Sequence, residues 1–200
     1  MKKRIAVLVS GGGTNLQALL DAEAAGKIPH GQITLVISNN PNAYALERAS
    51  LAGVTGIVIT KKECGSQQAF EAKIQAALEH NHIDLIILAG FMCILSENFT
   101  SRWPKKILNV HPSLIPSFCG EGFYGLRVHQ AALDYGVKVT GATVHFVNEI
   151  PDGGEIIAQK AVCIEPGDTP EILQKRVMEQ AEWILLPQAA EMVCASMEDD

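Results

Sequence analysis

Four continuous apolar runs of strand length alternate with helix-like segments in the first half of the chain. The apolar runs cover residues 5–9, 33–38, 55–60 and 84–90, and the helix-like segments cover 14–26, 43–53 and 66–81. Runs that are apolar at every residue are typical of strands covered on both faces, as in a parallel sheet. The alternation therefore predicts βαβ units in an α/β, Rossmann-like three-layer fold, where ligands bind beyond the carboxyl ends of strands.

The pattern changes after a further short apolar strand that ends near residue 111. A loop rich in Gly, Pro and aromatic residues is followed by a helix-like segment at 126–135 and by two longer strand-like runs at 138–147 and 155–164. Because a short turn-rich loop joins these two runs, we expect an antiparallel strand pair. The parallel N-terminal half would thus be extended into a mixed sheet.

The last predicted helix covers residues 169–193. Thr169 is placed to cap it and Pro170 lies in its first turn, whereas Pro187 is expected to kink or split it. The acidic end, residues 197–200, is expected to be a frayed, solvated tail. No repeat or low-complexity linker interrupts the sequence, so residues 1–200 are expected to form a single domain.

Composition narrows the possible partners and location. The 200 residues are 48% hydrophobic and 19% charged, enough for a core and a small-molecule cleft. The net charge of −6, without a long basic stripe, is unlike that of nucleic-acid-binding proteins. Five scattered cysteines without a Cys-x-x-Cys pair favour a reducing, cytoplasmic environment. The longest apolar stretch, 85–95, is too short to cross a bilayer, so no membrane partner is expected.

The first chemical motif is the glycine-rich turn "SGGGTNLQALL" at residues 10–20, between the first strand and the first helix. Free backbone N–H groups at such a turn bind anions, and Thr14 and Asn15 add donors, so a phosphate is the expected ligand. A dinucleotide is less favoured, because Leu16 occupies the third glycine position of G-x-G-x-x-G and no acidic ribose partner ends the second strand. A tight turn with a helix cap is the alternative.

The second motif is "LNVHPSLIP" at residues 108–116, where Asn109 and His111 lie two residues apart at a strand end. Their side chains point to the same side of the sheet, and Pro112 restrains the backbone after them. An Asn amide donates to a developing oxyanion, and a His acts as general acid or supplies positive charge. The pair therefore suits carbonyl chemistry. Among the other histidines, only His145 is near a strand position that could face the same cleft.

The third motif is "NEIPDGG" at residues 148–154, which contains Asp152. Viewed alone, such a carboxylate is a solvated turn former. If the loop folds over His111, the carboxylate would favour the charged imidazole, raise its pKa above roughly 6.5 and hold a water that relays a proton. A metal site made of His111, His145 and Asp152 is a further alternative, which no characteristic ligand spacing supports.

Four motifs together carry a resemblance that spans most of the chain. They are "SGGGTNLQ", "AGFMCILS", "LNVHPSLIP" and "VHFVNEIPDGGEIIAQ", in this order. The sequence resembles the phosphoribosylglycinamide formyltransferase family of folate-dependent enzymes in purine synthesis. The resemblance implies transfer of a formyl group from 10-formyltetrahydrofolate to the amino group of glycinamide ribonucleotide. It implies two small-molecule substrates and no metal.

The resemblance also implies roles for individual residues. Asn109 and a protonated His111 would stabilise the tetrahedral oxyanion, while Asp152 would keep His111 charged and move a proton through water. The implied ribonucleotide-binding residues are Gly13, Thr14, Asn15 and Glu182. The implied folate-binding residues are Gln67, Met92, Cys93, Ile94, Leu95, Asn109, Asn148, Glu149 and Ile150.

The chain departs from the family pattern in several places. Cys93 stands where many members carry Arg, and Gln67 where some carry another Arg, which changes the grip on the acidic tail of folate. In the loop after "HPSLIP", Ser117 replaces a frequent Lys and Cys119 a frequent Pro. Trp183 follows Glu182 where His is common. None of these positions belongs to the expected catalytic trio.

Three competing functions remain at this stage. A formyltetrahydrofolate deformylase shares the Asn, His and Asp pattern but is expected to carry an additional N-terminal regulatory domain. A methionyl-tRNA formyltransferase is expected to add a C-terminal RNA-binding domain. A non-catalytic sensor of nucleotide phosphates would use the glycine turn but would leave the Asn109, His111 and Asp152 set without a purpose.

Overall fold

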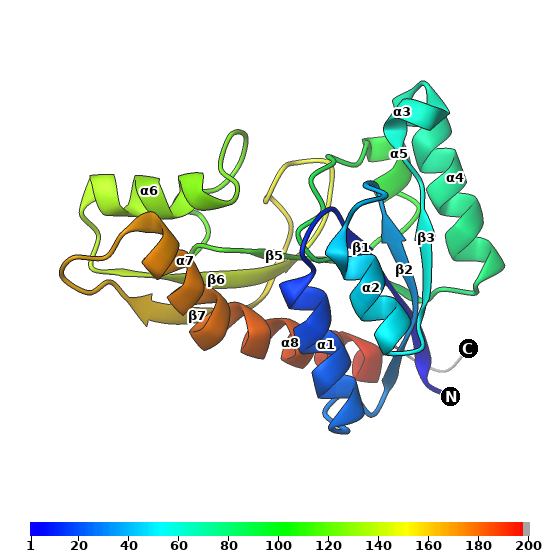
Figure 1. The fold of residues 1–200 in the computed structure, drawn as a ribbon, viewed down its shortest axis with the longest axis horizontal. Helices are drawn as coiled ribbons and strands as arrows, with labels where there is room; N and C mark the ends of the chain where they lie inside the picture. The colour runs from blue at the N-terminus through cyan, green and yellow to red at the C-terminus, as the bar shows by residue number, and fades with distance from the viewer. Residues whose placement is uncertain (198–200) are drawn as a thin grey trace.

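A computed structural model describes residues 1–197 and contains a seven-stranded mixed sheet (Figure 1). The strand order is β3-β2-β1-β4-β5-β6-β7, with parallel pairing from β3 to β5 and antiparallel pairing of β6 with both β5 and β7. The strands are β1 (Lys3–Val9), β2 (Gly31–Ser38), β3 (Thr55–Val58), β4 (Leu85–Leu88), β5 (Ile107–His111), β6 (Val139–Phe146) and β7 (Ile156–Cys163). The predicted mixed sheet is confirmed.

The predicted helices are also present, with ends that differ by a few residues. The helices are α1 (Thr14–Ala24), α2 (Tyr44–Leu51), α3 (Lys61–Cys64), α4 (Gln67–His80), α5 (Glu97–Thr100), α6 (Leu126–Tyr135), α7 (Pro170–Val177), the π-helix η1 (Met178–Glu182) and α8 (Trp183–Ser196). Only α3 and α5 were not predicted, because a single helical turn is too short to show a hydrophobic period. Residues 198–200 of the predicted tail lie outside the described residues.

Two hydrophobic cores, one on each face of the sheet, explain the continuous apolar strands. In β1, Ile5 and Val7 pack into one core while Ala6 and Leu8 pack into the other, and all four are fully buried. Helices α1, α2, α7 and α8 contribute to the first core, and α4 and α5 to the second. The three-layer α/β fold is therefore confirmed. Whether all 200 residues form a single domain stays a prediction.

The C-terminal helical segment differs from the prediction at Pro187. The predicted cap is present, since Thr169 Oγ1 accepts the Ile172 N–H at 3.3 Å. The predicted split at Pro187 is wrong, because α8 continues through this residue. Pro187 is the fifth residue of α8, so the N–H that it lacks would pair only with Trp183 at the beginning of that helix. A π-turn, η1, lies just before α8, and a kink at Pro187 stays a prediction.

The strand order places the expected site segments at one edge of the sheet. From β1 the chain extends the sheet through β2 and β3, and it then returns to place β4 on the other side of β1. Such a reversal leaves a crevice at the carboxyl ends of the strands. The glycine turn follows β1, the 89–96 loop follows β4, and His111 ends β5. No helix within residues 1–197 has an apolar stretch long enough to span a membrane.

Candidate active site

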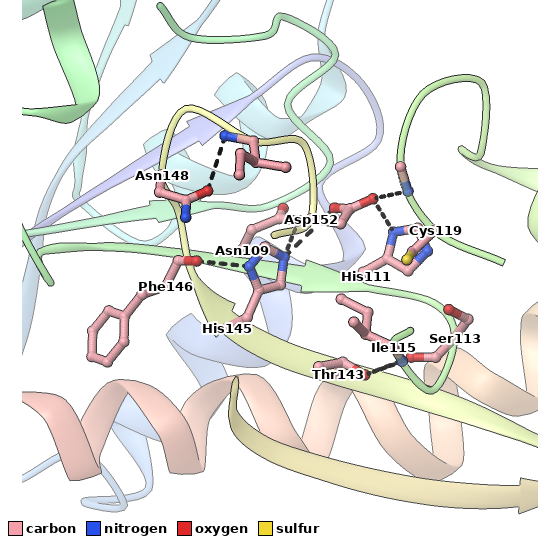
Figure 2. A network of polar contacts seen from close by, with 12 residues as sticks. Asn109, His111, Ser113, Ile115, Cys119, Thr143, His145, Phe146, Asn148 and Asp152 are labelled. Atoms are coloured by element: carbon pink, nitrogen blue, oxygen red, sulfur yellow. Dashed lines mark hydrogen bonds and ion pairs between the residues drawn. The ribbon is translucent and has the colours of Figure 1, made fainter. Parts of the chain in front are cut away.

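Asn109 is oriented by its cross-strand neighbour His145 (Figure 2). The two residues are direct partners in the β5–β6 register, and Asn109 Nδ2 lies 3.1 Å from His145 Nε2. His145 Nδ1 lies 2.8 Å from the carbonyl oxygen of Phe146. Because a carbonyl only accepts, Nδ1 donates to it, and the Asn109 amide nitrogen faces the other ring nitrogen, Nε2. The second amide hydrogen of Asn109 is not used in this contact.

The loop between β6 and β7 brings Asp152 to the same place. Glycine lets the end of this loop pass close to the backbone of β6, since a Cβ at Gly154 would lie 1.8 Å from the carbonyl oxygen of Phe146. Asp152 itself has a left-handed φ of 55°, which Asp tolerates better than most residues. Its Oδ2 lies 3.4 Å from His111 Nδ1, and its Oδ1 lies 3.6 Å from His145 Nε2. The structure thus brings the three predicted residues together, with His145 as a fourth.

The backbone of the 112–125 loop also contacts this cluster. The Gly120 N–H donates to Asp152 Oδ2 at 2.9 Å, and His111 Nε2 donates to the Phe118 carbonyl, also at 2.9 Å. Sequence reasoning missed both contacts, because backbone groups leave no signature in residue type. The loop therefore engages both the acid and the imidazole of the trio.

The electrostatic balance at His111 differs from the prediction. Burial lowers the pKa of His111, and His145 adds to this, while Asp152 and the Phe118 carbonyl act in the opposite direction. The expectation that Asp152 raises this pKa above its ordinary value is therefore wrong. His111 is only 4% exposed, and the loss of hydration outweighs the nearby carboxylate.

Asp152 remains ionised in this environment. Burial acts to raise its pKa, but contacts with His145, His111 and the Gly120 N–H outweigh burial and lower it. The resting pair is therefore an aspartate facing a neutral imidazole. Burial and Asp152 also raise the pKa of the nearby Cys119 thiol, which disfavours the thiolate needed for a nucleophile.

The glycine turn after β1 has the geometry of an anion site. Gly13 is the N-cap of α1 with φ 71°, and a Cβ there would lie 2.6 Å from Ala45 Cβ, so only glycine fits. No side chain caps this helix, and the backbone N–H groups of Gly13, Thr14 and Asn15 donate to no group within residues 1–197. These free donors at a helix N-terminus favour phosphate binding over a simple capped turn.

Glu182 lies next to this turn, as the resemblance implies. Asn15 Nδ2 donates to Glu182 Oε2 at 2.7 Å, which links the glycine turn to the π-helix η1. Glu182 is 6% exposed, and burial raises its pKa against the opposing effect of Asn15. The structure therefore brings together the four residues that were predicted to bind the ribonucleotide.

The expected folate segments follow β4 and β6. Met92 and Ile94 are more than half exposed, as is Ile150 in the loop after β6, whereas the Leu95 side chain is buried in the core. The Met92 N–H donates to Ser10 Oγ at 2.8 Å, which ties the 89–96 loop to the glycine turn. Exposed apolar side chains are therefore present in both segments that the resemblance assigns to folate.

The polar residues in these segments mostly hold their own loops. Gln67 Nε2 donates to Glu71 Oε1 at 2.6 Å and to the Ile94 carbonyl at 3.1 Å, and Cys93 Sγ accepts from Asn39 Nδ2 at 3.0 Å. Asn148 Oδ1 accepts the Ile150 N–H at 3.0 Å, and Glu149 is exposed. Within residues 1–197, no group of three or more His, Cys, Asp or Glu residues has an arrangement that could hold a metal ion.

Comparison with known proteins identifies the family. The model of the family described as "Formyl transferase" matches residues 3–189. The phosphoribosylglycinamide formyltransferase of Haemophilus influenzae is 44% identical over 178 residues, which cover 89% of this chain and 81% of that protein. The crystal structure of glycinamide ribonucleotide transformylase 1 from Symbiobacterium toebii superimposes with a TM-score of 0.90 at 41% identity, covering 97% of this chain and 88% of that chain.

The chain therefore belongs to the formyl transferase family. Its relatives within that family carry the name phosphoribosylglycinamide formyltransferase, which confirms the resemblance seen in the sequence. The chain is also 44% identical to the trifunctional purine biosynthetic protein adenosine-3 of Gallus gallus, over 97% of this chain. It spans only about a fifth, 19%, of the length of that relative.

Proposed function

We propose that this protein transfers the formyl group of 10-formyltetrahydrofolate to the amino group of glycinamide ribonucleotide in de novo purine biosynthesis. The observation that carries the proposal is the convergence of Asn109, His111 and Asp152 at the end of β5. The names of the similar proteins support this substrate pair. The product would be N-formylglycinamide ribonucleotide.

The two substrates occupy neighbouring parts of the crevice in this proposal. The ribonucleotide phosphate binds the free N–H groups of the Gly13–Asn15 turn, with Glu182 beside it. The folate ring binds between the 92–95 and 148–150 segments. Because only β4 separates β1 from β5, the glycine turn and Asn109 are roughly two strand spacings, about 10 Å, apart. A sugar phosphate extended along this edge brings its amine to the formyl carbon.

The catalytic residues then act on the tetrahedral intermediate. The substrate amine attacks the formyl carbon, and the oxyanion that forms accepts a hydrogen bond from Asn109. Neutral His111 accepts a proton from the attacking nitrogen and becomes an imidazolium beside the oxyanion. Asp152 stabilises that imidazolium and positions a water for the proton transfer. The proton is finally delivered to the departing folate nitrogen, so the residues end in their initial state.

This sequence of steps fits the lowered pKa of His111. A neutral ring is available as a base at neutral pH, and the charge that Asp152 stabilises develops only as the intermediate forms. His111 Nε2 donates to the Phe118 carbonyl in this structure, so the ring has to leave that carbonyl and carry its proton on Nδ1, which faces Asp152, before Nε2 can accept a proton from the substrate.

The remaining expectations on partners follow from this proposal. The reaction uses two small-molecule substrates, with no metal and no nucleic acid or membrane partner. Protein partners are not specified by the site. A cytoplasmic location is expected for an enzyme of purine synthesis and stays a prediction.

Formation of tetrahydrofolate from 10-formyltetrahydrofolate by the purified protein tests the proposal, with and without glycinamide ribonucleotide. Tetrahydrofolate formation that requires the ribonucleotide and is lost in His111→Ala supports formyl transfer. Tetrahydrofolate formation without the ribonucleotide indicates a hydrolase. Ribonucleotide binding without any tetrahydrofolate formation favours a phosphate-sensing protein, which would use the glycine turn alone.

A further inference from the structure

Arg48 of α2 contacts both the glycine turn and the beginning of α1. Its Nε donates to the Gly12 carbonyl at 2.8 Å, and its Nη1 donates to Gln17 Oε1 at 2.9 Å. The guanidinium carbon lies 5.0 Å from the centre of the Tyr44 ring, within cation–π distance. These three contacts fix the guanidinium beside the turn.

The beginning of α2 also holds the preceding carbonyl. The Ala45 N–H donates to the Gly11 carbonyl at 3.1 Å. In a trans peptide, the N–H of one residue points opposite to the carbonyl of the residue before it. Because α2 binds the carbonyls of Gly11 and Gly12, the N–H groups of Gly12 and Gly13 point away from α2. Arg48 thereby sets the direction of the Gly13 N–H.

Gln17 keeps Arg48 in this position. Its Nε2 donates to Asp21 Oδ1 at 2.8 Å, one helical turn along α1, so its amide oxygen faces Arg48. Arg48, Gln17 and Thr14 line a groove of about 590 Å³ between α1 and α8. The chain as a whole carries a charge of −6, so a fixed cation at this point is a local trap for an anion.

We propose that Arg48 is a positioning residue for the phosphate of the ribonucleotide substrate. It orients the Gly12–Gly13 peptide so that its N–H faces the phosphate, and its charge offsets the anion from behind the turn. The inference rests on the proposed function, because it assigns the phosphate of that substrate to the turn. Neither the sequence motifs nor the resemblance pointed to this arginine.

The test compares Arg48→Met with the unaltered protein in two measurements. Calorimetric titration with glycinamide ribonucleotide, without folate, gives the Kd, and steady-state transfer gives KM and kcat. We expect Kd and KM for the ribonucleotide to rise roughly 10- to 100-fold, the effect of losing hydrogen bonds to a charged group. The kcat and the KM for folate should stay within about twofold, because Arg48 is remote from the reacting atoms.

An acceptor without phosphate separates positioning from general damage. Glycinamide riboside should be used by Arg48→Met about as well as by the unaltered protein, because only phosphate binding is impaired. Arg102→Met is the matched control, since it removes an exposed arginine just after α5, which packs on the other face of the sheet. It should leave the ribonucleotide Kd unchanged.

Arg48→Lys provides a second variant that keeps the charge but cannot bind the Gly12 carbonyl and Gln17 together. A Kd for Arg48→Lys between those of Arg48→Met and the unaltered protein supports the inference. If Arg48→Met fails to fold, a ribonucleotide Kd of Arg48→Lys above that of the unaltered protein supports it. Equal Kd values for all three proteins, or equal losses for riboside and ribonucleotide, would overturn it. Failure of the unaltered protein to bind the ribonucleotide would instead reject the proposed function.

Discussion

Asn109 Nδ2 lies 3.1 Å from His145 Nε2, across the antiparallel pairing of β5 with β6. His145 in turn donates to the Phe146 carbonyl, so its ring cannot rotate freely or offer a second acceptor. The contact fixes which side of the Asn109 amide carries the nitrogen, and it leaves one N–H of that amide available. An amide held in this way is suited to bind an oxyanion without reorganising.

Replacing Asn109 by Ala should therefore slow formyl transfer strongly. One oxyanion donor typically contributes about 2.7–4 kcal/mol to the barrier, so kcat should fall roughly 100- to 1000-fold. Steady-state transfer assays measure the change, with Asn98→Ala, at an exposed position of α5, as control. A fully active Asn109→Ala protein would remove this residue from the mechanism.

Replacing Asp152 by Asn should move the pH profile of kcat/KM toward lower pH. The neutral form of His111 acts as the base, so activity should rise as pH increases through the pKa of His111, which burial holds below 6.5. Asp152 raises that pKa, so its removal lowers the pKa further and shifts the rising limb downward. The overall rate should also fall, because the imidazolium loses its partner. A shift of the limb to higher pH would contradict the assignment.

Gly13→Ala should destabilise the fold as well as the anion site. A left-handed φ for Ala and a Cβ only 2.6 Å from Ala45 Cβ together should cost about 2–4 kcal/mol of unfolding free energy. At Gly12, an added Cβ meets nothing within 4 Å, so Gly12→Ala should change that free energy by less than about 0.5 kcal/mol. Urea denaturation measures both. Equal stability of the two variants would show that the turn can relax.

His129→Leu should make the protein less sensitive to acid. His129 on α6 is fully buried, neither ring nitrogen has a hydrogen-bond partner within residues 1–197, and burial lowers its pKa to about 4. The unfolded chain takes up this proton near pH 6.5, so stability is lost as pH falls from there toward 4. The loss should amount to about 3 kcal/mol, since one pKa unit corresponds to about 1.4 kcal/mol.

Urea denaturation at pH 7, 5.5 and 4 measures this acid sensitivity. His129→Leu should lose about 3 kcal/mol less than the unaltered protein over this range. His80→Leu, which removes an exposed histidine at the end of α4, is the control. Identical pH dependence of His129→Leu and the unaltered protein would show that His129 does not remain neutral in the fold.

The sequence alone determined the architecture, because hydrophobic period is a local property. Strands such as β1, apolar at every residue, already indicate a sheet covered on both faces, and the two cores provide those covers. Thr169 and Pro170 mark the beginning of a helix by their own backbone chemistry. The motif around Asn109 and His111 likewise placed two polar side chains at a strand end.

The tertiary structure decided the properties that depend on residues far apart in the chain. The pKa of His111 depends on how deeply the fold buries the ring, and no motif encodes that burial, so its direction was predicted wrongly. The contacts of the Phe118 carbonyl and of Arg48 with site segments arise from chain paths that only the folded sheet fixes. Local patterns therefore specified which chemical groups reach this edge of the sheet, while packing determined their charge states and their partners.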